Sequence, residues 1–277
     1  MQIKISSNGN AFLGDPKTQL RIGNVAQSCP YEISSKTELQ VELELPNFHC
    51  NIGGEDPTTG QMACLMCPRS LRDFKREDDH VASICDSLKP HVANIQRLEI
   101  SGLAEPFWRD RIFEILESLD LNRDSNIKIV TTTNGTLLNK TTRDRWFDLV
   151  PKSEIRFSID ATNPETYVRI RRIHEFDLVV ENMNQYCRER DPDRHVAVLG
   201  NNINMLNVDE LDEMVQMTKD NFCHVLSLVP TASVGPHLND ICLNTSNESI
   251  FREAAEKAKR KAKELKVNVR FPGNWPA

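Results

Sequence analysis

The sequence lacks several features that mark whole classes of protein. No stretch reaches the roughly 18 uninterrupted apolar residues of a membrane-spanning helix. The first residues, Met1 to Ser6, have no apolar core like that of a signal peptide. Basic residues are not in surplus, because 34 Lys and Arg stand against 40 Asp and Glu, which gives a net charge of −6. We therefore expect a cytoplasmic protein with no nucleic-acid partner and no membrane partner.

The chain also has no internal repeat and no low-complexity segment. Its apolar residues, 39% of 277, suffice for a core, so wholesale disorder is excluded. In a reducing cytoplasm its 8 cysteines are expected to be thiols, metal ligands or catalysts rather than a disulfide framework.

Short segments typical of strands alternate along the chain with amphipathic segments typical of helices. The expected strands are 38–48, 95–100, 127–131, 154–159, 195–199, 223–229 and 267–271. The expected helices are 70–88, 106–119, 141–150, 164–189 (broken near His174), 208–220 and 247–265. Strands separated by helices predict βαβ units, and hence an α/β fold whose parallel sheet winds toward an open or closed barrel.

The cysteine spacing is the sharpest chemical signal. Cys64 and Cys67 form a Cys-x2-Cys pair, and 13 residues separate it from Cys50, which follows the first expected strand. Three thiolates from one loop can hold an iron–sulfur cluster and leave one iron open to a small molecule. The three cysteines also fit a zinc site completed by His49 or His80, and the pair alone also fits simple buried thiols. A thioredoxin-like pair is disfavoured because it does not open a helix beside a short βαβ core.

Four segments resemble motifs of one enzyme family, and each lies at the end of a successive expected strand. They are Cys64–Ser70 (CLMCPRS), Leu98–Pro106 (LEISGLAEP), Thr131–Leu138 (TTTNGTLL), and Arg156–Ala161 (RFSIDA) followed by Pro164–Tyr167. They resemble the cluster loop, the Gly-Glu-Pro, Thr-Asn-Gly and Ser-Ile-Asp motifs of radical S-adenosylmethionine (radical SAM) enzymes, in the molybdenum-cofactor-synthase-like and peptide-maturase-like group. The resemblance covers residues 39 to about 229.

The resemblance implies a partial (β/α)6 TIM-type barrel over residues 39–277, after an N-terminal extension, 1–38. It implies a [4Fe–4S] cluster and S-adenosylmethionine (SAM) as cofactors, and an external one-electron reductant of flavodoxin or ferredoxin type. The reduced cluster would cleave SAM, and the resulting 5′-deoxyadenosyl radical would take a hydrogen from the substrate. By position, the metal ligands are Cys50, Cys64 and Cys67; the SAM-binding residues are Met66, Ala104, Glu105, Ser158 and Arg171; and Thr133 and Asn134 face the substrate.

Two positions depart from the family pattern. The usual spacing is Cys-x3-Cys-x2-Cys, whereas the first gap here is 13 residues and is rich in turn-forming residues. Cys50 is still the best first ligand, because Cys29 and Cys85 do not follow the first strand. Ala104 stands where glycine is usual, which restricts how closely the backbone approaches SAM. Arg172 is an alternative to Arg171, and both also read as ordinary surface charges on a helix.

Three hypotheses for the function follow. The favoured one is a radical SAM enzyme that acts on a small molecule, because residues before Glu38 are too few for a leader-peptide-binding domain. The alternative is a radical SAM maturase that modifies a peptide or protein side chain. A non-enzymatic iron–sulfur or zinc protein would leave Glu105, Asn134 and Ser158 without a shared explanation. Since Cys242 is the last cysteine, one cluster is expected.

The segment from Thr231 to Thr245 joins the sixth expected strand to the long helix and carries Cys242. Long connections of this kind are often functional. A thiol there would return a hydrogen atom to a substrate radical, so Cys242 is a candidate catalytic residue. The competing interpretation is an inert cysteine packed between Ile241 and Leu243.

Overall fold

The computed structural model describes residues 2–5, 10–13, 20–24, 38–45, 50–52, 63–70, 79–233 and 235–271. Within these ranges, no helix combines the length and the apolar character that crossing a membrane requires. The chain divides into two compact units. Unit 1 comprises Met1–Asn51, Lys75–Thr132 and Asn139–Glu154, and unit 2 comprises Ile52–Phe74, Thr133–Leu138 and Ile155–Ala277.

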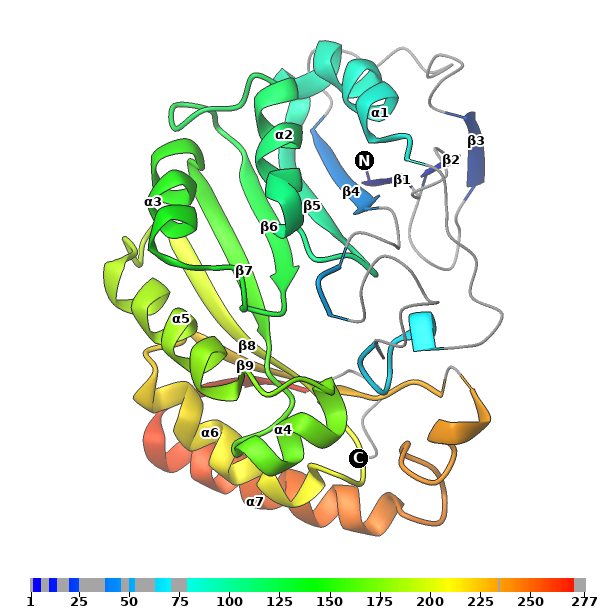
Figure 1. The fold of residues 1–277 in the computed structure, drawn as a ribbon, viewed down its shortest axis with the longest axis vertical. Coiled ribbons are helices and arrows are strands. Elements are labelled where there is room, and N and C mark those ends of the chain that lie inside the picture. Colours follow the sequence, from blue (N-terminus) through cyan, green and yellow to red (C-terminus); the bar gives the residue numbers. More distant parts are fainter. Residues whose placement is uncertain are drawn as a thin grey trace. The chain divides into compact units, whose positions relative to one another are not determined.

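The sheet of unit 1 is mostly parallel (Figure 1). Its strands are β1 (Gln2–Ile5), β2 (Asn10–Leu13), β3 (Leu20–Asn24), β4 (Leu39–Leu45), β5 (Ile95–Gly102) and β6 (Lys128–Thr133, the last residue of which belongs to unit 2). They lie in the order β6-β5-β4-β1-β2-β3. The pairs β6/β5, β5/β4 and β4/β1 are parallel, whereas β2 pairs antiparallel with both β1 and β3.

The helices of unit 1 are α1 (Val81–Leu88), α2 (Arg111–Ser118) and α3 (Lys140–Leu149), with short 3-10 helices at Lys89–Asn94 and Trp108–Asp110. Strand β4 alternates buried and more exposed residues along its length, as a strand with one buried face does. Trp146 of α3 is fully buried and meets the rings of Phe107 and Phe113 edge to face, at centroid distances of 5.5 and 6.4 Å. This aromatic cluster anchors α2 and α3 in the core of unit 1.

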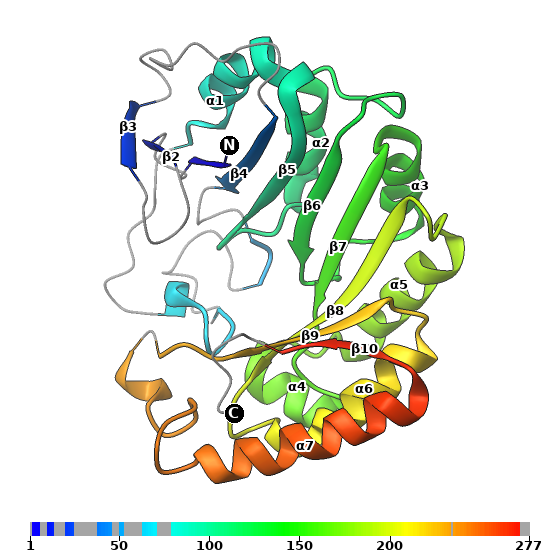
Figure 2. The ribbon, with the colours of Figure 1, turned by 180° about the vertical axis from the view of Figure 1, so that it is seen from behind.

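Unit 2 contains the strands β8 (His195–Ile203), β9 (Val225–Pro230) and β10 (Asn268–Arg270), together with most of β7 (Lys152–Ser158). Their order is β7-β8-β9-β10, and both β8/β9 and β9/β10 are parallel (Figure 2). The helices are α4 (Pro164–Arg171), α5 (Phe176–Glu189), α6 (Leu211–Asp220) and α7 (Glu248–Leu265), with 3-10 helices at Pro68–Ser70, Val208–Glu210 and Pro236–Leu238. Helices α6 and α7 pack side by side. The predicted α/β class with parallel strands joined by helices is confirmed.

Three local differences from the sequence prediction have identifiable causes. No element was expected before Glu38, yet three strands form there, each too short for a clear periodic pattern. The helix predicted from Ser70 begins at Val81, whose N–H bonds the Asp79 carboxylate; residues 71–78 lie outside the described ranges. The helix predicted from Pro106 begins at Arg111, because the two preceding residues have left-handed φ angles of 53° and 58°.

The predicted break in the segment 164–189 is confirmed. Helix α4 begins at Pro164, and the side chain of Asn163 caps its first turn by accepting from the Thr166 N–H. It ends because Arg172 adopts a left-handed conformation with φ 62°. Helix α5 then starts at Phe176, two residues after the expected position of the break, and this end of α4 proves central to the candidate site.

Candidate functional site

The segment that carries Cys64 and Cys67 is a tight turn in unit 2. The Cys67 N–H donates to the Cys64 carbonyl at 2.9 Å, and the 3-10 helix Pro68–Ser70 follows directly. Arg69 ties the turn to an earlier part of the same unit, because its Nη1 donates to the Ile52 carbonyl at 3.0 Å. Neither cysteine is in a disulfide, and both have intermediate exposure. The turn therefore holds the two sulfurs near the surface on a defined backbone.

The C-terminal end of α4 holds this cysteine segment through three successive residues. The Ile170 carbonyl accepts from the Leu65 N–H at 2.8 Å. Arg171 Nη1 lies 3.7 Å from Cys64 Sγ as a hydrogen-bond donor, and Arg172 Nη1 donates to the Ala63 carbonyl at 3.2 Å. The last residue of α4 and the left-handed residue after it thus both direct their arginine side chains at the cysteine segment.

A second element touches the same segment from the loop that follows β9. His237, in the 3-10 helix Pro236–Leu238, places its ring Nε2 3.2 Å from the Leu65 carbonyl. Both backbone polar groups of Leu65 are therefore engaged, by α4 on the N–H side and by this loop on the carbonyl side. Met66, the predicted adenine neighbour, lies in the same turn with intermediate exposure.

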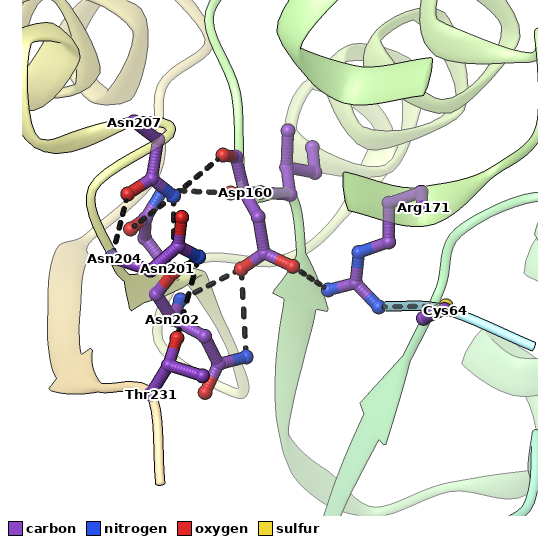
Figure 3. Close-up of polar contacts among 9 residues, drawn as sticks. Cys64, Asp160, Arg171, Asn201, Asn202, Asn204, Asn207 and Thr231 are labelled. Atoms are coloured by element: carbon purple, nitrogen blue, oxygen red, sulfur yellow. Dashed lines mark hydrogen bonds and ion pairs between the residues drawn. The ribbon is translucent and has the colours of Figure 1, made fainter. Parts of the chain in front are cut away.

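Arg171 is buried and paired with a buried carboxylate (Figure 3). Its Nη2 lies 2.5 Å from Asp160 Oδ2, and Asp160 is 0% exposed. Burial raises the pKa of Asp160, while Arg171 and the donors from Asn202 oppose that rise. Burial by itself would lower the pKa of Arg171, but Asp160 and Cys64 outweigh it and raise the pKa, so the guanidinium stays charged. The sequence left open that Arg171 is an ordinary surface charge, and its burial excludes that interpretation.

A cluster of asparagines at the end of β8 holds Asp160 in place (Figure 3). Asn202 donates to Asp160 Oδ1 from its backbone N–H at 2.6 Å and from Nδ2 at 3.4 Å. Asn207 Nδ2 donates to the Asp160 carbonyl at 2.8 Å, and Asn204 reaches Thr231 Oγ1 at 3.3 Å. This cluster was not predicted from the sequence. The sequence feature that could have indicated it is the run of asparagines at the end of a strand, because asparagine is depleted in strands.

The Thr-Asn-Gly motif forms a turn after β6. Thr133 Oγ1 accepts from the Gly135 N–H at 3.0 Å, and Asn134 Oδ1 accepts from the Thr136 N–H at 3.0 Å. Gly135 has φ 79°, and a Cβ there would lie 2.9 Å from Val179 Cγ1, so the position requires glycine. Asn182 Nδ2 donates to the Gly135 carbonyl at 2.9 Å. Thr133 and Asn134 are buried and shape this turn; their contact with a substrate stays a prediction.

Ser158 ends β7 and has intermediate exposure. The Ile159 N–H after it donates to the Gly200 carbonyl of β8 at 3.0 Å. Ser158, Asp160 and the asparagine cluster therefore all lie at the carboxyl ends of neighbouring strands of unit 2, where parallel α/β sheets place their sites. The role of Ser158 toward SAM stays a prediction.

The other predicted site residues lie in unit 1, also after carboxyl ends of parallel strands. Strands β4 and β5 pair up to Leu45 and Gly102, and Cys50 follows the first strand while Glu105 follows the second. Cys50 has intermediate exposure, and Glu105 is 1% exposed. The Phe107 N–H donates to Glu105 Oε1 at 3.2 Å, which orients the carboxylate. Ala104 has intermediate exposure.

Cys242 lies in the loop between β9 and α7 and is 5% exposed. Burial raises the pKa of its thiol. The loop is fixed locally, since the Ile241 carbonyl accepts from the Met205 N–H at 2.8 Å and Asn247 Nδ2 donates to the Cys242 carbonyl at 2.8 Å. A catalytic role for this thiol stays a prediction.

Among the described side chains, no three His, Cys, Asp or Glu residues are grouped closely enough to hold a metal ion. His80, one partner considered for a zinc site, lies beside the start of α1 in unit 1, and His49 is outside the described ranges. Cys64 and Cys67 belong to unit 2 and Cys50 to unit 1. The assignment of Cys50, Cys64 and Cys67 as ligands of one cluster therefore rests on the sequence motif.

No protein-family model matches the chain. Two curated relatives do, both GTP 3′,8-cyclases. The protein of Alkaliphilus oremlandii is 30% identical over 166 residues, which are 57% of this chain and 49% of the relative. The protein of Desulforamulus reducens is 27% identical over 172 residues, 60% of this chain and 47% of the relative. The chain thus spans about half the length of these relatives.

Solved structures share the fold. Streptococcus suis SuiB bound to its precursor peptide SuiA superposes with a TM-score of 0.61 at 14% identity, over 86% of this chain and 49% of SuiB. SuiB has also been solved bound to SAM. A radical SAM methyltransferase from Sphaerobacter thermophilus gives a TM-score of 0.55 at 13% identity, over 94% of this chain and 68% of that protein. The order of the four motifs, the two relatives and this shared fold agree in what they resemble, which is the radical SAM family. SAM and a [4Fe–4S] cluster are the characteristic cofactors of that family.

Proposed function

We propose that this chain is a radical SAM enzyme that cleaves SAM reductively and abstracts a hydrogen atom from a small-molecule substrate. The observation that carries the proposal is the cysteine turn of unit 2, with two part-exposed thiols and a buried, charged arginine donating toward one of them. A guanidinium beside a cysteine favours the thiolate form of that cysteine, and thiolates are the ligands of iron–sulfur clusters.

The residues that would hold the cluster are Cys50, Cys64 and Cys67. The donor set fits, because three thiolates leave one iron open for a small molecule. Burial raises the pKa of Cys67, and the Arg69 N–H and the nearby arginines oppose that rise. When bound, the cluster supplies the electron that splits SAM into methionine and a 5′-deoxyadenosyl radical. An external flavodoxin- or ferredoxin-type protein would deliver that electron.

The motif assigns SAM binding to Met66, Ala104, Glu105, Ser158 and Arg171. We propose the first four as SAM-binding residues, because Arg171 already has Asp160 and Cys64 as partners. Glu105 supports this assignment best, because a buried carboxylate oriented by a backbone N–H is complementary to the SAM ammonium group. The Ser158 hydroxyl would donate to the carboxylate or ribose of SAM, and Met66 would pack on the adenine.

Two observations bear on the substrate. The relatives at 27–30% identity are named for a reaction of GTP, a small molecule. SuiB, whose structure holds a peptide, is only 14% identical. We therefore favour a small-molecule substrate bound beside Thr133 and Asn134. Modification of a peptide or protein side chain is the alternative.

The first experiment is anaerobic reconstitution with iron and sulfide. The wild-type chain should bind about four irons and release 5′-deoxyadenosine from SAM when reduced. Cys50→Ala should lose the cluster, whereas Cys85→Ala, a buried cysteine of α1 in the same unit, should keep it. A wild-type chain that binds zinc and no iron would overturn the proposal, and a Cys50→Ala chain with a full, active cluster would remove Cys50 from the ligand set.

A second experiment separates the two substrate classes. A metabolite extract passed through a small-pore filter and treated with protease is added to the reduced enzyme with SAM. A small-molecule substrate should stimulate 5′-deoxyadenosine release despite the protease. Stimulation that disappears after protease treatment would favour the peptide alternative.

A further inference from the structure

Arg171 is held at both ends of its guanidinium, by the buried Asp160 and the part-exposed Cys64 (Figure 3). One terminal nitrogen lies 2.5 Å from Asp160, and the other lies 3.7 Å from Cys64 Sγ. Cys64 and Arg171 are 107 residues apart in the sequence, so this contact is created by the fold. Both terminal nitrogens thus face protein groups before any cofactor binds.

Asp160 cannot easily follow a moving arginine, because the end of β8 fixes it. Asn202 donates to its carboxylate twice, and Asn207 donates to its backbone carbonyl. Both partners of the ion pair are buried, at 0% and 7% exposure. Burying two charges has a large desolvation penalty, so stability alone is a weak explanation for this pair. A fixed orientation of the guanidinium toward sulfur is what the arrangement provides.

We infer that Arg171 is a positioning residue for the cluster ligand Cys64, and that Asp160 and Asn202 fix its orientation. This inference rests on the proposed function. An N–H donor withdraws electron density from a ligating sulfur and stabilises the more negative, reduced cluster. Arg171 therefore raises the reduction potential of the cluster and keeps Cys64 in place through the end of α4. Its role differs from the contact with the SAM carboxylate expected from the motif.

The test is a redox titration of the reconstituted cluster, followed by electron paramagnetic resonance, with iron content measured in parallel. Arg171→Gln removes the charge, Arg171→Lys keeps it, and Asp160→Asn removes the carboxylate that orients the guanidinium. Arg169→Gln is the matched control, because Arg169 lies on the same helix and is exposed.

We expect Arg171→Gln to shift the midpoint potential to more negative values. Asp160→Asn should shift it in the same direction by less, Arg171→Lys should recover part of the shift, and Arg169→Gln should leave the potential unchanged. If Arg171→Gln loses its iron, Asp160→Asn and Arg171→Lys carry the measurement.

The outcomes separate this inference from the proposed function. A wild-type chain without iron overturns the proposed function. A wild-type chain that binds iron, together with Arg171→Gln or Asp160→Asn variants that bind as much iron at an unchanged potential, overturns the positioning role alone. An unchanged potential with weaker SAM binding, measured by equilibrium dialysis, would return Arg171 to the SAM carboxylate.

Discussion

Unit 2 contains two pairs of cysteines, each with an arginine beside it, and the two arginines do different things. Beside Cys64 and Cys67, Arg171 points at a sulfur and a carboxylate. Beside Cys187 and Cys223, Arg190 instead donates to backbone, to the Cys187 carbonyl and to the Phe222 carbonyl at 2.7 Å. The same residue types therefore contact a sulfur and a carboxylate in one place and close a helix end in the other.

The two pairs also lie at opposite ends of the strands of their unit. Cys223 lies two residues before β9, whereas Asp160 and Thr231, which belong to the network behind Arg171, follow strands β7 and β9. In a parallel sheet the carboxyl ends carry the site-forming loops, and the amino ends receive the returning helices. The sulfurs of Cys187 and Cys223 lie 3.7 Å apart, and Cys187 is on the buried face of α5. Position relative to the strand ends, and not the residue types alone, separates a candidate site from packing.

The largest expected difference between the pairs is iron content. A Cys64→Ala/Cys67→Ala double variant should lose all bound iron after reconstitution, because two of three ligands are gone. A Cys187→Ala/Cys223→Ala double variant should bind as much iron as the wild type. Iron and sulfide analysis of both double variants measures this difference. Iron loss from the second variant, with its circular dichroism unchanged, would break the comparison.

The next effect concerns stability. Arg190→Gln should lower the free energy of unfolding by about 3 kcal/mol, because charged hydrogen bonds to one buried and one part-buried carbonyl are lost. Arg188→Gln, on the same helix but with its side chain bonded only to nearby surface groups, should lower it by less than about 1 kcal/mol. Urea unfolding measures both. Equal losses, or a changed cluster potential in Arg190→Gln, would contradict a purely structural role.

A third difference is the response to a mild disulfide-forming oxidant. The sulfurs of Cys187 and Cys223 need to close from 3.7 Å to about 2.05 Å to form a disulfide. The hydrogen bond from Cys223 lowers the pKa of Cys187, and Arg190 lowers it further, which favours the attacking thiolate. With glutathione disulfide as oxidant, we expect an intramolecular bond between them.

Peptide mapping with mass spectrometry tests that bond. The linked peptides should appear in the wild-type chain and be missing from the Cys187→Ala variant. If both thiols instead stay free for alkylation under conditions that oxidise a model dithiol, the contact is simple packing.

The smallest expected effect is a pH dependence beside the second pair. His224 Nδ1 accepts from the Ala197 N–H at 3.1 Å and lies 3.2 Å from Arg190 Nη2. Burial and then Arg190 lower the pKa of His224 from 6.5, so the unfolded chain binds the proton more readily than the folded one. Stability contributed by the neutral ring is therefore present above pH 6.5 and is lost as pH falls below it.

Unfolding free energies measured at several pH values check this effect. His224→Asn keeps an acceptor that does not titrate, and it should flatten the slope between neutral and mildly acid pH. His174→Gln, at an exposed position, should leave the slope as in the wild type. A slope that survives in His224→Asn would assign it to another group.

The sequence by itself determined the order of most strands and helices, because alternation in β4 and amphipathic periodicity in the helices are local properties. It located the Cys64/Cys67 turn from the Cys-x2-Cys spacing and the Thr-Asn-Gly turn from its Asn-Gly pair, which is typical of turns. It missed β1 to β3, which are too short for a periodic pattern, and it placed the start of α2 too early because left-handed residues at Arg109 and Asp110 carry no such pattern.

Only the tertiary structure decided what Arg171 does. From the sequence, a surface charge and a SAM ligand are equally good interpretations of Arg171, because each expects an arginine near the end of a helix. The fold buries it between Asp160 and a cysteine 107 residues away, and it adds four asparagines and a threonine from the ends of β8 and β9. Such contacts depend on which strand ends lie side by side in three dimensions, and that adjacency is set by the packing of the whole sheet rather than by any local stretch of chain.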